Sequence, residues 1–549
     1  MRETAKEPDF AFNRIYNQLQ RMDFNNFICS PLVNGGCGLG KTTALTDERM
    51  YELFKEKLNK ANPRILFIES RSVTRDQLRD KHINPNYIFL QFAAASTVDL
   101  TQFDIIVIDE AHSLFVDSDF AARQMEPLAR WLRESKCFQI YITASDIEFL
   151  GFANTYFQNR EFSLTFPDLE NLHVRFLAEQ MILSINSKKL DRVIKIKEKD
   201  FFTLGKKGIF FTLSAQDAMN LRDYYTEMGY KCAFYISQQN STKVSTDISV
   251  EEEDRTILDY TSLTKTISLI DYFHTEEKRR TAQGLPTIRE SLIAGKMPPD
   301  IDYLFITDTG REGLDIKEGQ LDFIFIEDTI PLTINQKIYR YRGNIPLVYI
   351  SLPQRRLEKI YINSIKQVQE LMNESQDYLR GYYKGSGSKK GKNSLEQIIV
   401  YNEKEDKYEV SQLYLSKLLF YTKEFNEIRE NVKDTQFLRE KYGTQAEKFL
   451  VEDLNEVNRK NILADFFKDK IGLIITKEMK EQFVRELKEK GLTNEKQNKD
   501  FSFEMVIQYC KKYNICVFKK KRATKKDIKK NSNLIYRNVY LMVDELTVS

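Results

Sequence analysis

Short, continuous apolar runs alternate with amphipathic stretches from about residue 20 to residue 355. The runs are FNNFICSPLVN (24–34), RILFIES (64–70), YIFLQF (87–92), FDIIVID (103–109), FQIYITA (138–144), KGIFFTL (207–213), KCAFYI (231–236), DYLFITD (302–308), LDFIFIE (321–327) and PLVYISL (346–352). Because successive side chains of a strand point to opposite faces, an unbroken Ile, Val and Phe run is typical of a strand buried on both faces. Such strands alternating with helices predict α/β domains built on parallel sheets.

The pattern divides the chain into three parts. Residues 170–205 contain no strong strand run and become charged toward their end, so the junction between two α/β domains is expected there. After about residue 356 the spacing predicts helices, interrupted by the Gly/Ser/Lys-rich segment 382–394, which is typical of a flexible linker. We therefore expect one parallel-sheet domain over residues 1–190, a second over 191–355 and a mainly helical C-terminal region over 356–549.

Composition narrows the class of protein without indicating a ligand. The 549 residues include 83 Lys and Arg against 80 Asp and Glu, so a nucleic-acid partner has to be sought in the local distribution of charge. Six cysteines without a CxxC pair and only four histidines argue against a zinc site and fit a reducing cytoplasm. The polar N-terminal segment and the absence of an apolar run of about 20 residues predict a soluble, cytoplasmic protein.

A glycine-rich segment after the first expected strand carries the strongest local motif. Residues 35–42, GGCGLGKT, fit the pattern G-x-x-x-x-G-K-[ST]. Glycines let backbone N–H groups surround phosphate oxygens, and a helix starting near Lys41 directs its positive end to the same place. Lys41 is expected to reach the β- and γ-phosphates of ATP, and Thr42 to hold Mg²⁺. The candidate ATP-binding residues here are Gly35, Gly38, Gly40, Lys41, Thr42 and Thr43; the alternative is a glycine-rich turn that binds nothing.

Two acids end another expected strand. The segment 104–112, DIIVIDEAH, places Asp109 at the carboxyl end of the strand, where it is expected to face the phosphate loop and contact Mg²⁺ through water. Glu110 is a candidate to polarise the attacking water. The alternative is an acid pair that is satisfied by the amides of a helix N-terminus.

Asp109-Glu110-Ala111-His112 is the DEAH sequence of superfamily 2 helicases, and the further motifs of that family follow in order. They are Glu69-Ser70-Arg71-Ser72 (similar to motif Ia), Thr143-Ala144-Ser145 (motif III), Phe210-Phe211-Thr212 (motif IV), Thr307–Asp315 (motif V, in a form similar to that of excision-repair helicase subunits) and Gln336–Gly343 (motif VI). The resemblance covers about residues 20–355 and implies two tandem RecA-like domains with ATP and Mg²⁺ bound between them.

The resemblance also implies roles for residues of the second domain. Arg340 and Arg342 are the candidate arginine fingers, because a guanidinium stays charged and contacts two phosphoryl oxygens at once. The family spacing is Q-x-x-x-R-x-x-R, whereas the second arginine comes one residue early here, so either arginine could be the one that contacts ATP. The alternative is that this basic stretch is a solvated face of a helix. Further candidates near ATP are His112, Gly313, Asp315 and Gln336; a helix-capping acid is the alternative for Asp315, and a packed histidine the alternative for His112.

The expected partner is nucleic acid. Candidate contacts from the resemblance are Ser70, Arg71, Thr97, Thr212 and Thr307, and the basic cluster 519–530 adds Lys519, Lys520, Lys521 and Arg522. Tyr509, Tyr513, Phe518 and Tyr536 lie near this cluster, either to stack on bases or to form a small core.

The motif variants favour DNA over RNA, and the resemblance predicts a DNA helicase or translocase similar to bacteriophage or plasmid replication helicases. An RNA helicase, and an ATP-dependent loader that recruits replication or repair proteins through its C-terminal region, remain the alternatives.

Overall fold

The computed structural model divides the chain into two compact units. Unit 1 comprises Met1–Met181 and Gly205–Phe449, and unit 2 comprises Ile182–Leu204 and Leu450–Ser549. The structure describes residues 9–35, 40–69, 84–167, 178–185, 190–203, 205–236, 243–247, 264–307, 316, 321–338, 340, 341, 343, 345–352, 354–384, 395–443, 446–492, 501–522, 524–530 and 539–544.

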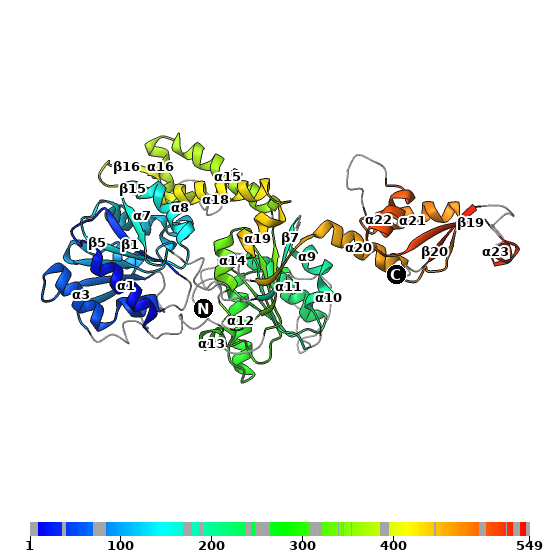
Figure 1. Ribbon diagram of the computed structural model, residues 1–549, viewed down its shortest axis with the longest axis horizontal. Coiled ribbons are helices and arrows are strands. Elements are labelled where there is room, and N and C mark those ends of the chain that lie inside the picture. The colour runs from blue at the N-terminus through cyan, green and yellow to red at the C-terminus, as the bar shows by residue number, and fades with distance from the viewer. Residues whose placement is uncertain are drawn as a thin grey trace, which may run out of the picture. The chain divides into compact units, whose positions relative to one another are not determined.

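Unit 1 begins with a six-stranded sheet of order β3-β2-β4-β5-β1-β6, in which all pairings are parallel (Figure 1). Its strands are β1 (Cys29–Val33), β2 (Ile65–Glu69), β3 (Tyr87–Gln91), β4 (Ile105–Ile108), β5 (Phe138–Ile142) and β6 (Glu161–Leu164). Its helices are α1 (Phe10–Arg21), α2 (Lys41–Leu45), α3 (Glu48–Leu58), α5 (Phe92–Ala95), α6 (Ser113–Val116), α7 (Ser118–Glu134) and α8 (Asp146–Tyr156), with a 3₁₀ turn at Leu100–Gln102.

Strand β4 shows why its apolar run is unbroken. Ile105 and Val107 belong to the core that includes side chains of α1 and α3, whereas Ile106 and Ile108 belong to the core that includes side chains of α7 and α8. Because alternate side chains enter different cores, every position of the strand has to be apolar.

A seven-stranded sheet of order β17-β7-β14-β13-β8-β12-β9 follows, and its strands from β14 to β9 pair in parallel. Its strands are β7 (Ala178–Ile185), β8 (Gly208–Phe211), β9 (Cys232–Tyr235), β12 (Tyr303–Ile306), β13 (Phe323–Glu327), β14 (Ile345–Ser351) and β17 (Ala446–Asp453). Helices α11 (Ala215–Glu227), α12 (Leu269–Ala282), α13 (Ile288–Ile293) and α14 (Pro331–Ile338) and the hairpin of β10 (Lys243–Asp247) and β11 (Thr264–Ser268) belong to the same part of the chain. Gly208 is required by close approach, since a Cβ there would lie 2.1 Å from the ring of Phe323.

The segment after the second sheet returns to the first domain. Its elements are α15 (Gln354–Met372), α16 (Gln376–Tyr383), α17 (Leu395–Ile398), β15 (Ile399–Asn402), β16 (Lys407–Val410), α18 (Gln412–Glu430) and α19 (Thr435–Tyr442). The start of α18 is fixed by buried Glu126 of α7, whose carboxylate accepts hydrogen bonds from the hydroxyl of Ser411 (2.6 Å) and the backbone N–H of Leu413 (3.1 Å). Residues 395–430 are thus structurally part of unit 1 and cover α7 and α8 (Figure 1).

Unit 2 is assembled from two segments that are distant in sequence. The first supplies α9 (Leu190–Ile196) and α10 (Glu198–Phe201). The second supplies α20 (Leu454–Phe467), β18 (Ile474–Ile475), α21 (Lys477–Glu489), α22 (Phe503–Lys512), β19 (Val517–Arg522), α23 (Lys525–Lys530) and β20 (Val539–Asp544). Lys197 joins the two segments through a 2.7 Å ion pair with Glu452, and the amide of Asn461 donates to the carbonyl of Ile196.

The two tandem parallel-sheet domains predicted from the sequence are confirmed, and the described elements after residue 356 are mainly helices. The expectation that residues 170–205 hold no strong strand is wrong, because β7 spans Ala178–Ile185. The boundaries expected at residues 190 and 355 remain a prediction. No helix in the described part of the chain is long and apolar enough to cross a bilayer.

Candidate nucleotide site

The carboxyl ends of β1, β2, β4 and β5 lie at one edge of the first sheet, because these strands run parallel. Asn34 follows β1 and is fully buried; its amide donates to the carboxylate of Asp146 (2.9 Å) and to the carbonyl of Phe166 (3.1 Å). Gly35 and Gly40 both have positive φ, 116° and 78°, which a side chain would strain. Asn34 thus fixes the start of the glycine-rich segment, and Gly40 lets the chain turn into α2; Gly38 lies outside the described residues.

Lys41 and Thr42 begin α2 and point to different partners. The ammonium of Lys41 donates to the carbonyl of Gly35, across the glycine-rich segment. The hydroxyl of Thr42 donates to Oδ2 of Asp109 at 2.7 Å, and Thr43 is exposed. Because α2 has only five residues, the positive charge at this place comes mainly from Lys41 and less from the helix dipole.

Asp109 and Glu110 follow β4 in a strained turn. Glu110 has a φ of 48°, a left-handed conformation that costs a residue other than glycine about 1 kcal/mol or more and is concentrated at functional sites. Its N–H donates to Oδ1 of Asp109 at 2.8 Å. Burial, and then the charge of Glu110, raise the pKa of Asp109 to about 6, although the hydroxyl of Thr42 and the charge of Lys41 oppose this. A bound cation would favour the ionised carboxylate and so oppose the effect of burial on the pKa of Asp109.

Glu69 is a third acid at this place, and its burial beside Asp109 was not predicted. It ends β2, is 1% exposed, and its Oε1 has no hydrogen-bond partner. Burial, followed by the charges of Asp109 and Glu110, raises its pKa to about 9, so it is a neutral acid at pH 7. An acid that ends a fully apolar strand next to the strand of Asp109 was the available signal.

His112 links three elements. Its Nδ1 lies 3.1 Å from the hydroxyl of Thr143 after β5, and its Nε2 lies 2.8 Å from the amide nitrogen of Gln336 on α14. Since the amide nitrogen of Gln336 can only donate, we assign the proton of the neutral imidazole to Nδ1, which donates to Thr143. The first sheet and α14 of the second are thus joined by a buried hydrogen bond, which brings together two of the predicted ATP-binding residues.

The second parallel sheet supplies Arg340, which follows α14 and is half-buried. Its carbonyl accepts from the N–H of Ile316, and the helix before it is fixed by a buried ion pair of 2.8 Å between Lys337 and Asp328. Sequence reasoning missed this pair, although Asp328 directly follows an apolar strand. Arg342, Gly313 and Asp315 lie outside the described residues.

The predicted nucleic-acid contacts are in different environments. Thr97 is exposed, and its hydroxyl donates to the carbonyl of Ala94 at 2.9 Å. Thr212 is fully buried at the end of β8, and Thr307 is half-buried after β12. Ser70 and Arg71 lie outside the described residues. In unit 2, Lys519 and Arg522 are exposed on β19, which also contains Lys520 and Lys521.

A cavity of about 1040 Å³ lies elsewhere in unit 1, between α7 and α8 on one side and α15 and α18 on the other. Tyr156, Phe157, Val368 and Leu415 are among its lining residues. Neither Lys41 nor Asp109 lines this cavity, so the Lys41–Asp109 site is identified by its polar groups.

No protein-family model and no curated protein matches the chain. Among solved structures, T. fusca Cas3 with ADP is 12% identical, with a TM-score of 0.40 over 63% of this chain and 47% of that chain. S. cerevisiae Dbp5 bound to RNA and ADP BeF3 is 15% identical, with a TM-score of 0.37 over 66% of this chain and 92% of that one. Mss116p bound to ssRNA and AMP-PNP is 12% identical, with a TM-score of 0.34 over 65% and 76%. This chain spans about half the length of the Cas3 chain.

Proposed function

We propose that the chain is an ATPase of the superfamily 2 helicase type, which hydrolyses ATP at the Lys41–Asp109 site when nucleic acid is bound. The observation that carries the proposal is the 2.7 Å hydrogen bond between Thr42 and Asp109, which places a hydroxyl and a carboxylate together beside a lysine on a glycine-rich turn. These groups match what a nucleoside triphosphate with a divalent cation requires.

The oxygen atoms of Thr42 and Asp109 fit Mg²⁺, which prefers hard oxygen ligands and is usually bound by one or two side chains together with substrate phosphates. The raised pKa of Asp109 supports the fit, since a cation would favour the ionised form. When bound, Mg²⁺ would neutralise charge on the phosphate oxygens. Lys41 would leave the carbonyl of Gly35 and bind the phosphates.

Glu110 is the proposed base that orients the attacking water. Its side chain is 40% exposed, so it is open to water, while its strained backbone holds it directly after Asp109. Arg340 and Arg342 are the proposed arginine fingers, which would stabilise the negative charge that develops on the transferred phosphoryl group. The hydrogen bond between His112 and Gln336 would couple the position of α14 to changes at the ATP site of the first domain.

Nucleic acid is the proposed activator, and DNA is favoured over RNA because of the motif variants in the sequence. ATP-driven changes between the two domains would move the chain along a strand. The proposed setting is replication or repair in a bacterial or phage-infected cell. A loader that binds ATP and recruits a partner without displacing a strand is the second candidate, and strand-displacement activity separates the two.

The test is the rate of ATP hydrolysis with single-stranded DNA, with RNA and with neither. We expect stimulation in the wild type, and a loss of about 10²-fold or more in both Lys41→Ala and Glu110→Gln. Glu56→Gln, which neutralises an exposed carboxylate on α3, is the matched control and should hydrolyse ATP at the wild-type rate. Equal rates with and without polynucleotide, or full activity in Lys41→Ala, would contradict the proposal.

A further inference from the structure

Unit 2 has the arrangement of a winged helix. Helices α20, α21 and α22 contact one another, and β18, β20 and β19 form an antiparallel sheet in that order. Along the chain a helix is followed by a short strand, two helices and a hairpin, and α22 packs on β19. In helix-turn-helix proteins the second helix of the pair enters the major groove of DNA. The topology thus presents α22 and the hairpin after it as one candidate surface.

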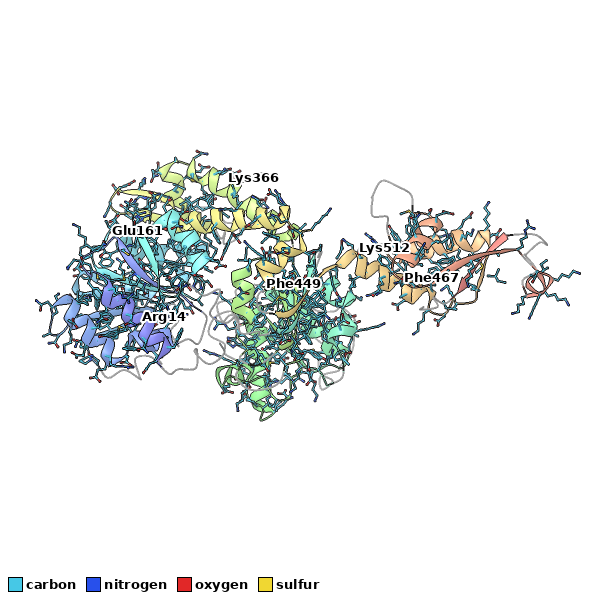
Figure 2. All side chains as sticks on the ribbon, viewed as in Figure 1. Arg14, Glu161, Lys366, Phe449, Phe467 and Lys512 are labelled. Carbon is cyan, nitrogen blue, oxygen red and sulfur yellow. The ribbon has the colours of Figure 1, made fainter. Side chains whose placement is uncertain are left out.

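The aromatic side chains near this hairpin face inward. The ring of Phe518 lies edge-on to those of Phe467 and Phe503, at 5.4 and 5.6 Å, and Tyr509 is 7% exposed (Figure 2, where Phe467 is labelled). The sequence left open whether Tyr509, Tyr513 and Phe518 stack on bases or form a small core; Tyr509 belongs to the core, and Tyr513 and Phe518 are partly buried and pack against it. Tyr536 lies outside the described residues. These core rings are not placed to bind the bases of a single strand.

Positive charge is concentrated in the same part of the chain. Residues 450–549 contain 22 Lys and Arg against 15 Asp and Glu, whereas the whole chain contains 83 against 80. The first 449 residues are therefore net acidic, with 61 basic against 65 acidic side chains. Residues 511–530 alone hold ten Lys and Arg against one Asp. A polyanion would be attracted to this unit rather than to the chain as a whole.

The described basic side chains are exposed. We define the basic edge as Lys519, Arg522, Lys525, Lys526, Lys529 and Lys530, all of which are exposed on β19 and α23. On α22, the solvent face carries Glu504, Gln508 and Lys511, which lie on one side of the helix at a spacing of four and three residues. A helix face with a glutamine and a lysine beside a basic hairpin matches the groove and the phosphates of a duplex.

We infer that unit 2 contains a second nucleic-acid site, at which the basic edge binds the phosphates of duplex DNA and the exposed face of α22 lies against the groove. The site depends on the proposed function for the choice of DNA over another polyanion. It binds without ATP, because none of its residues belongs to the Lys41–Asp109 site. A duplex is favoured over a single strand because the basic edge, which would bind phosphates, is exposed. The aromatic rings that could stack on the bases of a single strand pack in or against the core.

The test is binding of the full chain to a fluorescent DNA duplex of about two helical turns, by anisotropy, at salt concentrations from about 50 to 200 mM and without nucleotide. The double variant Lys519→Glu/Arg522→Glu should bind roughly 10–100-fold more weakly at about 100 mM salt, and its slope of log K against log salt should fall by about 2. Both side chains are exposed, and an unchanged circular dichroism spectrum and melting temperature would confirm that the variant folds.

The matched control is Lys460→Glu/Lys468→Glu, which makes the same change of net charge at exposed lysines in the α20 region of the same unit. It should change affinity less than about threefold. Equal losses in both double variants would overturn the inference, because net charge rather than a site would then explain binding. Preference for a single strand over the duplex would overturn it as well.

Hydrolysis of ATP separates this inference from the proposed function. Polynucleotide-stimulated hydrolysis together with unchanged duplex binding by Lys519→Glu/Arg522→Glu would refute only the second site. Loss of duplex binding in that variant, in a chain whose hydrolysis never responds to a polynucleotide, would refute only the motor.

Discussion

Glu69 offers a quantitative test of the electrostatics of the proposed nucleotide site. Its carboxyl is 1% exposed and close enough to Asp109 and Glu110 for their charges to raise its pKa from an ordinary value of 4.5 to about 9. In the unfolded chain the same group is ionised above pH 5. Between these two values the folded chain binds a proton that the unfolded chain does not, so stability falls as pH rises. Glu69→Gln removes this dependence and keeps a neutral side chain of similar size.

The expected change in the free energy of unfolding follows from the width of the pH range in which only the folded chain binds the proton. A proton bound only in the folded state changes the free energy of unfolding by about 1.4 kcal/mol per pH unit. From pH 6.5 to 8.5, above the pKa of about 6 of Asp109, the wild type should lose about 2–3 kcal/mol more than the variant. At pH 6.5 the variant should already be about 2–3 kcal/mol more stable than the wild type, because the unfolded wild type has been ionised since about pH 4.5.

The chain contains its own probe for this measurement. Trp131 is the single tryptophan; it lies in α7 and packs against the core of the first sheet, so its fluorescence reports the unfolding of that domain. Urea unfolding would be followed at pH 6.5, 7.5 and 8.5, without metal or nucleotide, in the wild type and in Glu69→Gln. Parallel pH slopes in the two proteins would show that Glu69 is ionised in the fold and would refute the account of this site.

Three further outcomes are expected. Gln336→Leu removes the 2.8 Å contact with His112 and should lower polynucleotide-stimulated ATP hydrolysis several-fold; the exposed control Gln436→Leu on α19 should not. Lys337→Met leaves a buried carboxylate unpaired and should destabilise the fold by about 3–5 kcal/mol in urea unfolding, and a loss below 1 kcal/mol would contradict a buried ion pair. Tyr442→Phe removes a buried 2.7 Å hydrogen bond to a backbone carbonyl and should cost about 1–2 kcal/mol of stability in thermal unfolding, an effect that should be absent in the exposed control Tyr378→Phe.

The pattern of apolar residues along the sequence was sufficient to locate the inner strands of the two large sheets. Each of the ten apolar runs contains a strand, because a strand buried on both faces leaves an unbroken apolar pattern. Among the strands that were missed, β6 is half-buried, and β7 mixes Glu, Gln and Ser with apolar residues and lies outside the inner part of its sheet. The return of α18 to α7 was not predictable, since it depends on Glu126 meeting residues about 285 positions later.

The proximity of side chains at the proposed nucleotide site was predictable where chemistry is local. Lys41, Thr42 and Asp109 belong to two short motifs at strand ends, and the structure brings Thr42 and Asp109 together. The burial of Glu69 beside Asp109 and the ion pair of Lys337 were not predicted, because both depend on burial that the local sequence does not show. The roles of Arg340 and Arg342 stay a prediction.

The two-segment construction of unit 2 bears on synthesis and on truncation. Residues 182–204 leave the ribosome about 250 residues before the helix α20 that packs against α9. At about 5–20 residues per second, α9 would wait on the order of tens of seconds for its contact with α20. A nascent chain is thus exposed to chaperones and to aggregation in that interval, and a chain shortened near residue 450 would never form the contact between α9 and α20.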